Sequence, residues 1–386
     1  MLEDNLSSSS SSTSTHSDSS NCLPSINEFP KKDNSSFYSI IGIGDPIVDI
    51  LSQISMNEIV KYQLKLGDSI FASEDYNERN VEIFKILESM SLVNYTPGGS
   101  VQNTMRVISW CLNNNSSGRK NYKISMLGSV GDDLYKNKIM LSLEDIGVNP
   151  ILEILQGDKT SRCGVGIYKR EKLFVTQLRA SKRLSTKFIE DNLDKILDHQ
   201  AFLIEGYLLN NKFDIVKKLC DLFYEKKKTI ILTLSAEFIV KAHYEKIIEL
   251  GNKSDIIDGS MGEAKALAGI EKDNYEDVFR SIFKKLKPKN KRLLLITDGP
   301  NGAYCAKYNY ENDNFDFIIH SFAKKIKEEE IKDFNGAGDA FLGGFLSEYM
   351  KGSSIIQSCK NGINAASIIL KNVGCTFPRY TTLEKN

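Results

Sequence analysis

The stretch Asp333–Phe341, DFNGAGDAF, indicates both the kind of fold and the kind of chemistry to expect. Three small residues, Gly336, Ala337 and Gly338, precede a run whose apolar residues recur at helical spacing. A glycine-rich turn that opens a helix brings together unpaired N–H donors and the positive end of the helix dipole. That arrangement suits a phosphoryl group that develops negative charge during its transfer.

Asp339 falls in the first turn of the predicted helix. A carboxylate there repels a phosphate, so we interpret it as the general base that takes a proton from an attacking hydroxyl. An ordinary helix start, in which an acidic residue favours the helix dipole, explains the same residues. Short glycine motifs also occur by chance, and the motif taken alone fits both interpretations.

The composition points to a globular protein without a charged surface for large partners. The chain has 386 residues, 41% of them hydrophobic, with 50 basic and 50 acidic residues. This balance predicts no nucleic-acid or membrane partner, and we expect a monomer. Seven cysteines and four histidines, without a CxxC pair or a histidine cluster, argue against a disulfide framework and a zinc site. We therefore expect a reducing compartment, the cytoplasm and also the nucleus.

The N-terminus differs in kind from the rest of the chain. Ser7–Thr15 is an unbroken Ser/Thr tract, and polar residues continue to about Ser36. Such a segment cannot bury enough apolar surface to offset its ordering entropy. It also lacks the features of a signal or transit peptide. We predict a disordered tail over residues 1–36, followed by one domain over residues 37–380.

Short apolar runs alternate with helical patterns from Phe37 onward. This alternation predicts an α/β fold, with a mainly parallel sheet covered by helices on both faces. Active sites in such sheets lie at the carboxyl ends of the strands. The runs that we interpret as strands are Tyr38–Ile43, Lys123–Leu127, Ala201–Ile204, Thr229–Leu234, Asp255–Ile257 and Arg292–Thr297.

Two parts of the chain break this alternation and predict a small β lid. Arg162–Tyr168 and Leu173–Leu178 have the pattern of a hairpin, and Ile50–Ser55 and Ser69–Ala72 also have an extended pattern. A lid near residues 50–75 and 158–180 would suit a kinase, which must exclude water from the phosphoryl group that it transfers.

Polar and glycine-rich clusters follow several of the predicted strands. Asp49 can accept two hydrogen bonds from the vicinal diol of a ribose, or it can simply cap a turn. The glycines of Thr96–Asn103 allow the backbone to approach a ligand, although a loop with Ser100 as helix cap explains them too. Thr297–Gly302 could hold a nucleotide or be an ordinary turn. No Walker A motif or complete GxGxxG is present, so a dehydrogenase is disfavoured.

Taken together and in this order, these motifs resemble the ribokinase/phosphofructokinase-B family of sugar and nucleoside kinases, and within it the eukaryotic adenosine kinases. The resemblance covers about Phe37 to Pro378. Its most specific stretches are YTPGGSVQN at Tyr95–Asn103, LTLSAEF at Leu232–Phe238, DFNGAGDAFLGGF at Asp333–Phe345 and AASIILKNVGCTFP at Ala365–Pro378.

The resemblance implies a three-layer α/β/α domain with a small lid, ATP as donor and Mg²⁺ as cofactor. It makes Asp339 the catalytic base and Gly336, Ala337 and Gly338 an anion hole. It implies contacts to the nucleoside from Asp45, Asp49, Gly98, Gly99, Asn103 and Leu208, of which Leu208 stands where an aromatic residue flanks the adenine. It implies contacts to ATP from Lys172, Thr297, Gly299, Gly302, Asn335 and Asn364, and a role for Glu263 in holding the metal.

The chain departs from the family pattern at three places. Asp45-Pro46 stands where the family usually has Asn-Pro, and Thr233–Ala236 lacks the usual Asn. The usual Asn-x-x-Glu motif is reduced to Ser260-Met261-Gly262-Glu263, which predicts altered handling of the metal. The base and the anion hole are intact, so we expect an active adenosine kinase. The alternatives are another nucleoside or sugar kinase of the family and, from another class, a non-catalytic nucleoside-binding regulator.

Overall fold

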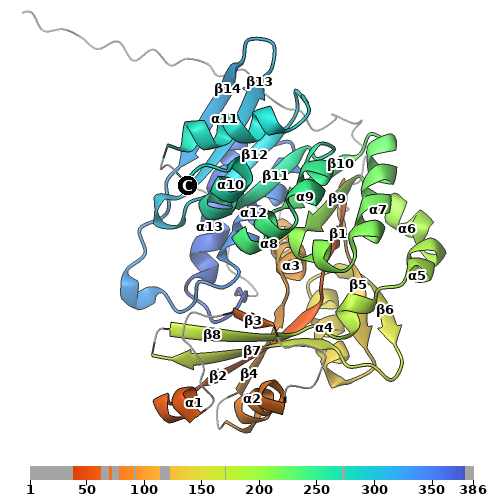
Figure 1. The fold of residues 1–386 in the computed structure, drawn as a ribbon, viewed down its shortest axis with the longest axis vertical. Coiled ribbons are helices and arrows are strands. Elements are labelled where there is room, and N and C mark those ends of the chain that lie inside the picture. The colour runs from red at the N-terminus through yellow and green to blue at the C-terminus, as the bar shows by residue number, and fades with distance from the viewer. Residues whose placement is uncertain are drawn as a thin grey trace, which may run out of the picture.

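The computed structural model describes residues 38–61, 69–71, 78–90, 93–113, 122–169, 171–271 and 274–378 (Figure 1). The tail expected over residues 1–36 therefore lies outside the described residues. Among the described residues, no helix is both long enough and apolar enough to cross a membrane.

A nine-stranded sheet forms the centre of the large domain, in the order β14-β13-β12-β11-β10-β9-β1-β5-β6. The pairs from β6 across to β12 are parallel, and β12, β13 and β14 are joined by antiparallel pairs. The strands are β1 (Tyr38–Ile43), β5 (Tyr122–Gly131), β6 (Val148–Leu155), β9 (Ala201–Glu205), β10 (Thr229–Thr233), β11 (Ile256–Ser260), β12 (Leu293–Thr297), β13 (Ala303–Asn309) and β14 (Asn314–Ser321).

Helices cover both faces of this sheet, because neighbouring residues of each strand face opposite sides and both sides are apolar. Ile41 packs into one core, and Ile40 packs into the other. The core around Ile41 includes α5 (Thr186–Asp191), α6 (Leu193–Leu197), α7 (Phe213–Glu225), α8 (Glu237–Ala242), α9 (Tyr244–Gly251), α10 (Met261–Ala268) and α11 (Tyr275–Lys285). The core around Ile40 includes α3 (Ser100–Asn113), α4 (Leu134–Glu144), α12 (Ala337–Tyr349) and α13 (Ile355–Ile369). The expected three-layer α/β/α fold is confirmed.

A second, five-stranded sheet forms the lid, in the order β3-β8-β7-β2-β4, and lies at the bottom of Figure 1. Its strands are β2 (Ile47–Gln53), β3 (Ser69–Phe71), β4 (Val93–Gly98), β7 (Ser161–Tyr168) and β8 (Glu171–Gln177). The predicted hairpin is the antiparallel pair β7–β8. Two helices accompany the lid, α1 (Met56–Lys61) and α2 (Glu78–Ser89), and Phe84 and Leu87 of α2 pack with Ile50 and Val175 of the sheet.

Four strands were not predicted, and β4 shows why. It contains Pro97, which is followed by Gly98 and Gly99, and such a sequence is typical of a loop. Proline is tolerated here because β4 is an edge strand of the lid and, among the described strands, pairs with β2 alone. The other three, β6, β13 and β14, lie toward the two edges of the large sheet.

Candidate active site

The turn Gly336–Gly338 opens α12 as the sequence predicted. Gly336 is the N-cap residue, with a φ of 74°, and a Cβ on it would lie 2.6 Å from Cβ of Cys375. Both its conformation and its packing therefore require glycine. A Cβ on the exposed Gly338 would meet nothing within 4 Å, so space for a ligand is present beside the helix start. The first turn of α12 therefore has the glycine conformation and the open space that an anion-binding helix terminus needs.

Asp339 is held by two side chains from the start of α3. Ser100 donates its hydroxyl to Oδ1 at 2.7 Å, and the Asn103 amide donates to Oδ2 at 2.9 Å. Burial raises the pKa of Asp339, and the two hydrogen bonds oppose this increase. A raised pKa makes the carboxylate a stronger proton acceptor, which suits a general base.

This arrangement changes the interpretation of two residues. Asn103 was expected to hold the ribose, but its amide holds Asp339, and its Oδ1 is buried without a hydrogen-bond partner among the described residues. Ser100 was interpreted as a helix cap, and its contact with Asp339 was missed. Ser100 and Asp339 are separated by 239 positions in the chain, so no local pattern could reveal the contact.

Asp49 lies in β2, which is an inner strand of the lid between β7 and β4. The two glycines of the TPGGS segment pack against Asp49 and Asp45. A Cβ on Gly98 would overlap the Asp49 carboxyl group. Gly99 has a φ of 94°, and a Cβ there would overlap the carbonyl oxygen of Asp45. These glycines are therefore required by close packing, which brings the lid strand against the end of β1.

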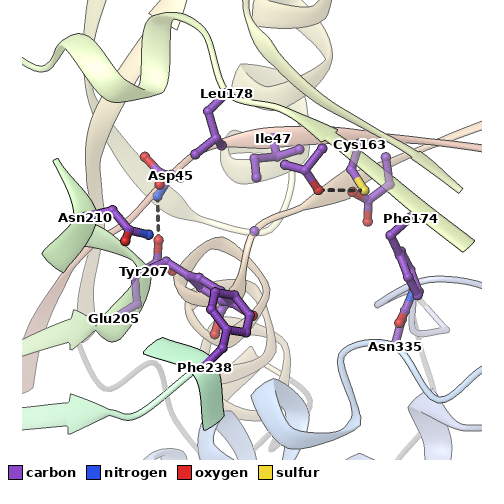
Figure 2. A pocket seen from close by; sticks show the side chains of 14 residues that line it. Asp45, Ile47, Cys163, Phe174, Leu178, Glu205, Tyr207, Asn210, Phe238 and Asn335 are labelled. Carbon is purple, nitrogen blue, oxygen red and sulfur yellow. Dashed lines mark hydrogen bonds between the residues drawn. The ribbon is translucent and has the colours of Figure 1, made fainter. Parts of the chain in front are cut away.

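A cavity of about 300 Å³ lies between the lid and the large domain (Figure 2). This volume is at the lower end of the range for small-molecule sites. The cavity is lined from the lid by Ile47, Asp49, Cys163, Phe174, Thr176 and Leu178, and from elsewhere by Asp45, Gly99, Ser100, Glu205, Tyr207, Asn210, Phe238 and Asn335.

Two aromatic rings line the cavity on the side of the large domain. The rings of Tyr207 and Phe238 lie with their centres 6.3 Å apart and at an angle of 49° (Figure 2). Leu208, expected beside the adenine, does not line the cavity, because its side chain is 0% exposed and packs into the core around Ile41. The short 3₁₀ helix Gly206–Asn210 turns Tyr207, and not Leu208, toward the ligand space.

Asp45 lines the cavity as expected, but its carboxylate also pairs with the ammonium of Lys212. Glu205 lies next to this pair and accepts the Asp45 N–H at 2.8 Å. The sequence interpretation missed both partners. A charged residue directly after an apolar strand, as in Ala201–Glu205, was the available signal.

Glu263 caps α10 together with Ser260. The Ser260 N–H donates to Oε2 of Glu263 at 3.0 Å, and the Glu263 N–H donates to the Ser260 hydroxyl at 3.3 Å. Burial raises the pKa of Glu263, and nearby Glu237 and Asp339 raise it further. Burial also raises the pKa of Asp258, and the charge of Glu263 raises it further. Carboxylates that repel one another in this way favour a cation nearby.

These oxygen donors fit Mg²⁺, which prefers hard oxygen ligands and retains several waters. Among the described residues, no group of three or more His, Cys, Asp or Glu side chains is placed to hold a metal directly.

The residues assigned to ATP lie in several segments. Thr297 ends β12, and Gly299 and Gly302 have φ values of 50° and 104° in the turn that follows. A Cβ on Gly302 would overlap the carbonyl oxygen of Ser321. Asn335 lines the cavity between the lid and the large domain, and Asn364 lies in α13. Lys172 lies in β8, paired with Ile167, and its side chain is outside those described.

Comparisons with known proteins identify the family of this chain. The model of the pfkB family carbohydrate kinases matches residues 56–382. Adenosine kinase of Dictyostelium discoideum is 28% identical over 347 residues, which cover 88% of this chain and 96% of that protein.

Solved structures show the same fold. Adenosine kinase from Schistosoma mansoni in complex with 2-fluoroadenosine superposes with a TM-score of 0.76 at 25% identity, covering 88% of this chain and 97% of that one. Trypanosoma brucei brucei adenosine kinase also gives a TM-score of 0.76, at 26% identity and with 88% and 100% of the two chains covered. The predicted resemblance is confirmed, and the chain belongs to the pfkB family of carbohydrate kinases.

Proposed function

We propose that this protein is an adenosine kinase, which transfers the γ-phosphoryl group of ATP to the 5′-hydroxyl of adenosine and forms AMP. The observation that carries the proposal is the placement of Asp339 at the start of α12, held by Ser100, a residue that lines the cavity. The same cavity has the Asp49 carboxylate and the rings of Tyr207 and Phe238, which suit a ribose diol and a purine.

The chain's own residues supply most of what the reaction needs. Asp339 accepts the proton of the 5′-hydroxyl as the oxygen attacks the phosphoryl group, while Ser100 and Asn103 keep its carboxylate in place. The N–H groups at the start of α12 stabilise the charge that develops on the transferred group. The lid excludes water from the cavity and so disfavours hydrolysis of ATP. A magnesium ion, with Glu263 near its waters, would neutralise the phosphates.

The test is a coupled assay of AMP formation with ATP and Mg²⁺. Adenosine, inosine, guanosine and ribose are compared at equal concentrations, with Asp339→Asn as the inactive control. We expect the highest kcat/KM for adenosine. Preference for another nucleoside or for ribose contradicts the substrate assignment, and binding without turnover would favour a regulator.

A further inference from the structure

Glu205 is a buried carboxyl group to which the sequence analysis assigned no role. It joins two segments that contribute lining residues to the cavity. Oε1 of Glu205 accepts the N–H of Asp45 at 2.8 Å, and Oε2 accepts the N–H of Val101 at 3.1 Å. Glu205 is 1% exposed. Asp45 follows the end of β1, and Val101 is the second residue of α3, so one side chain links a strand end to a helix start.

The helix start that Glu205 holds is the one that positions the base. Ser100 and Asn103, on either side of Val101, donate the two hydrogen bonds to Asp339. The packing around Glu205 is close: a Cβ on Gly44 would lie 2.8 Å from Cβ of Val101 and 3.1 Å from Oε2 of Glu205. A shift of Glu205 would therefore be transmitted to Ser100 and Asn103.

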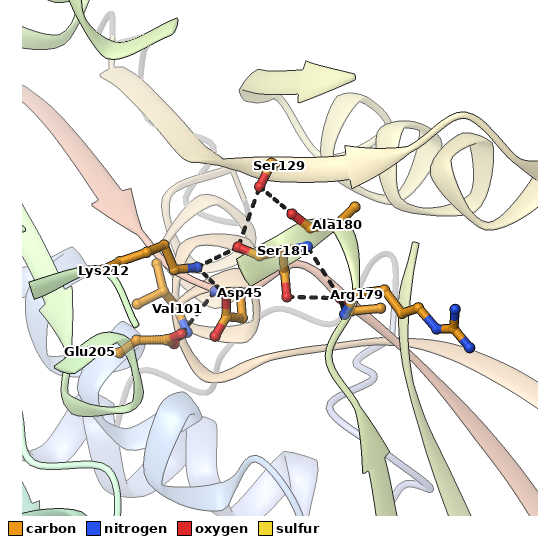
Figure 3. A network of polar contacts seen from close by, with 9 residues as sticks. Asp45, Val101, Ser129, Arg179, Ala180, Ser181, Glu205 and Lys212 are labelled. Atoms are coloured by element: carbon orange, nitrogen blue, oxygen red, sulfur yellow. Dashed lines mark hydrogen bonds and ion pairs between the residues drawn. The ribbon is translucent and has the colours of Figure 1, made fainter. Parts of the chain in front are cut away.

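Glu205 belongs to a small charged network that is shown in Figure 3. The ammonium of Lys212 binds the Asp45 carboxylate and also donates to the carbonyl oxygen of Ser181 at 2.5 Å. The side chains of Lys212 and Asp45 are only 2% and 5% exposed. One lysine thus faces two buried carboxyl groups, so the network is electrically neutral when one of them carries a proton.

The physical setting indicates which carboxyl group that is. Burial, followed by the charge of Asp45, raises the pKa of Glu205 to about 8, while its two backbone hydrogen bonds and Lys212 oppose the increase. Tyr207 faces the network from the 3₁₀ helix Gly206–Asn210. Burial raises the pKa of Tyr207, and the negative charge of Glu205 raises it further. Glu205 is therefore the carboxyl group that keeps its proton at neutral pH, and it ionises as the pH rises through about 8.

We propose that Glu205 is a positioning residue for phosphoryl transfer, which acts by fixing the start of α3 and thereby the Asp339 carboxylate. This inference rests on the proposed kinase function. Ionisation of Glu205 places a second negative charge beside Asp45 in a site that must also accept an anionic phosphoryl group. We therefore assign the basic limb of the pH–rate profile to Glu205.

The experiment measures kcat and KM for adenosine from pH 5 to pH 10 in the wild type, Glu205→Gln and Asp45→Asn. The wild type should lose kcat as the pH rises through about 8. Glu205→Gln cannot ionise, and its amide group can accept only one of the two N–H groups. It should lower kcat about 10- to 100-fold at pH 7, as for a misplaced catalytic group, with a smaller change in KM and no basic limb.

Asp45→Asn removes the charge that disfavours ionisation of Glu205, so its basic limb should move to lower pH. The matched control is Glu153→Gln. Glu153 also accepts a backbone N–H, from Ser185 at 2.7 Å, but it does not line the cavity. This control should keep the basic limb of the wild type. A Glu205→Gln protein with the wild-type kcat and the wild-type basic limb overturns the proposal. If Glu205→Gln fails to fold, an Asp45→Asn protein whose basic limb stays at the wild-type pH overturns it instead.

A second readout does not depend on turnover. A carboxyl group whose pKa is higher in the folded than in the unfolded protein stabilises the fold most at low pH, and this advantage is lost as the pH rises to the folded pKa. The melting temperature of the wild type relative to Glu205→Gln should therefore fall from about pH 5 to pH 8 and level off above it. A flat difference overturns the protonation of Glu205. Absence of AMP formation at every pH instead contradicts the proposed kinase function.

Discussion

Ser100 donates a hydrogen bond of 2.7 Å to the Asp339 carboxylate across a sequence separation of 239 residues. The contact joins the first residue of α3 to the first turn of α12, the two helix starts that meet beneath the lid. The base is therefore not positioned by its own glycine-rich motif alone. It is also fixed by the start of α3. Gly98 and Gly99, which precede this helix, pack against Asp49 and Asp45.

Replacing Asp339 with Asn should lower kcat by about 10²–10⁴-fold, because the general base is lost while the shape of the site is kept. Adenosine affinity should change little, since the nucleoside contacts that we propose are Asp49 and the rings of Tyr207 and Phe238, and not Asp339. Steady-state kinetics and calorimetric titration with adenosine measure the two effects. The exposed Asp191→Asn serves as a control for the same chemical change. Near-normal turnover in Asp339→Asn would remove this residue from the mechanism.

Replacing Ser100 with Ala should move the acidic limb of the pH–rate profile to higher pH. The Ser100 hydrogen bond lowers the pKa of Asp339, so its loss raises that pKa further and leaves less ionised base at a given pH. Activity should therefore fall at a higher pH than in the wild type as the solution is made more acidic, and it should recover as the pH is raised. The measurement is kcat against pH, and Ser100→Thr, which keeps the hydroxyl, is the matched control. An unchanged acidic limb in Ser100→Ala contradicts the assignment of that limb to Asp339.

Asp49 should determine the preference for a ribose over a deoxyribose. A nucleoside without the 2′-hydroxyl leaves part of the carboxylate unpaired, at a cost of about 1–3 kcal/mol for a buried acceptor. 2′-Deoxyadenosine should therefore be a much poorer substrate than adenosine, and Asp49→Ala should narrow the difference. The comparison needs kcat/KM for both nucleosides in both proteins. Equal values in the wild type would rule out this role.

Glu263 has two separable roles, in the helix cap and near the metal. Glu263→Gln keeps an oxygen that can accept the Ser260 N–H but removes the charge, whereas Glu263→Ala removes both. We expect both variants to need more free Mg²⁺ for half-maximal rate at fixed MgATP. Only Glu263→Ala should also lose stability, by about 0.5–2 kcal/mol, as for a lost helix cap. A Gln variant with the wild-type Mg²⁺ dependence would leave Glu263 as a cap alone.

The sequence by itself determined the features that depend on local pattern. The first strand was predicted at Tyr38–Ile43 and is observed there, because its apolar run is buried on both sides. The hairpin of the lid and the helix start at Gly336 were also predicted, since turn residues and glycine requirements act over a few positions.

The tertiary structure decided the features that depend on contacts between distant segments. Pro97 lies in a strand only because β2 offers it an edge position, and Tyr207 replaces Leu208 at the cavity because a 3₁₀ turn sets which side chain faces inward. Glu205 gains its neighbours from the segment after β1, from α3 and from Lys212, which no spacing in the chain brings together. Burial and long-range charge set the state of such groups, and both exist only once the chain has folded.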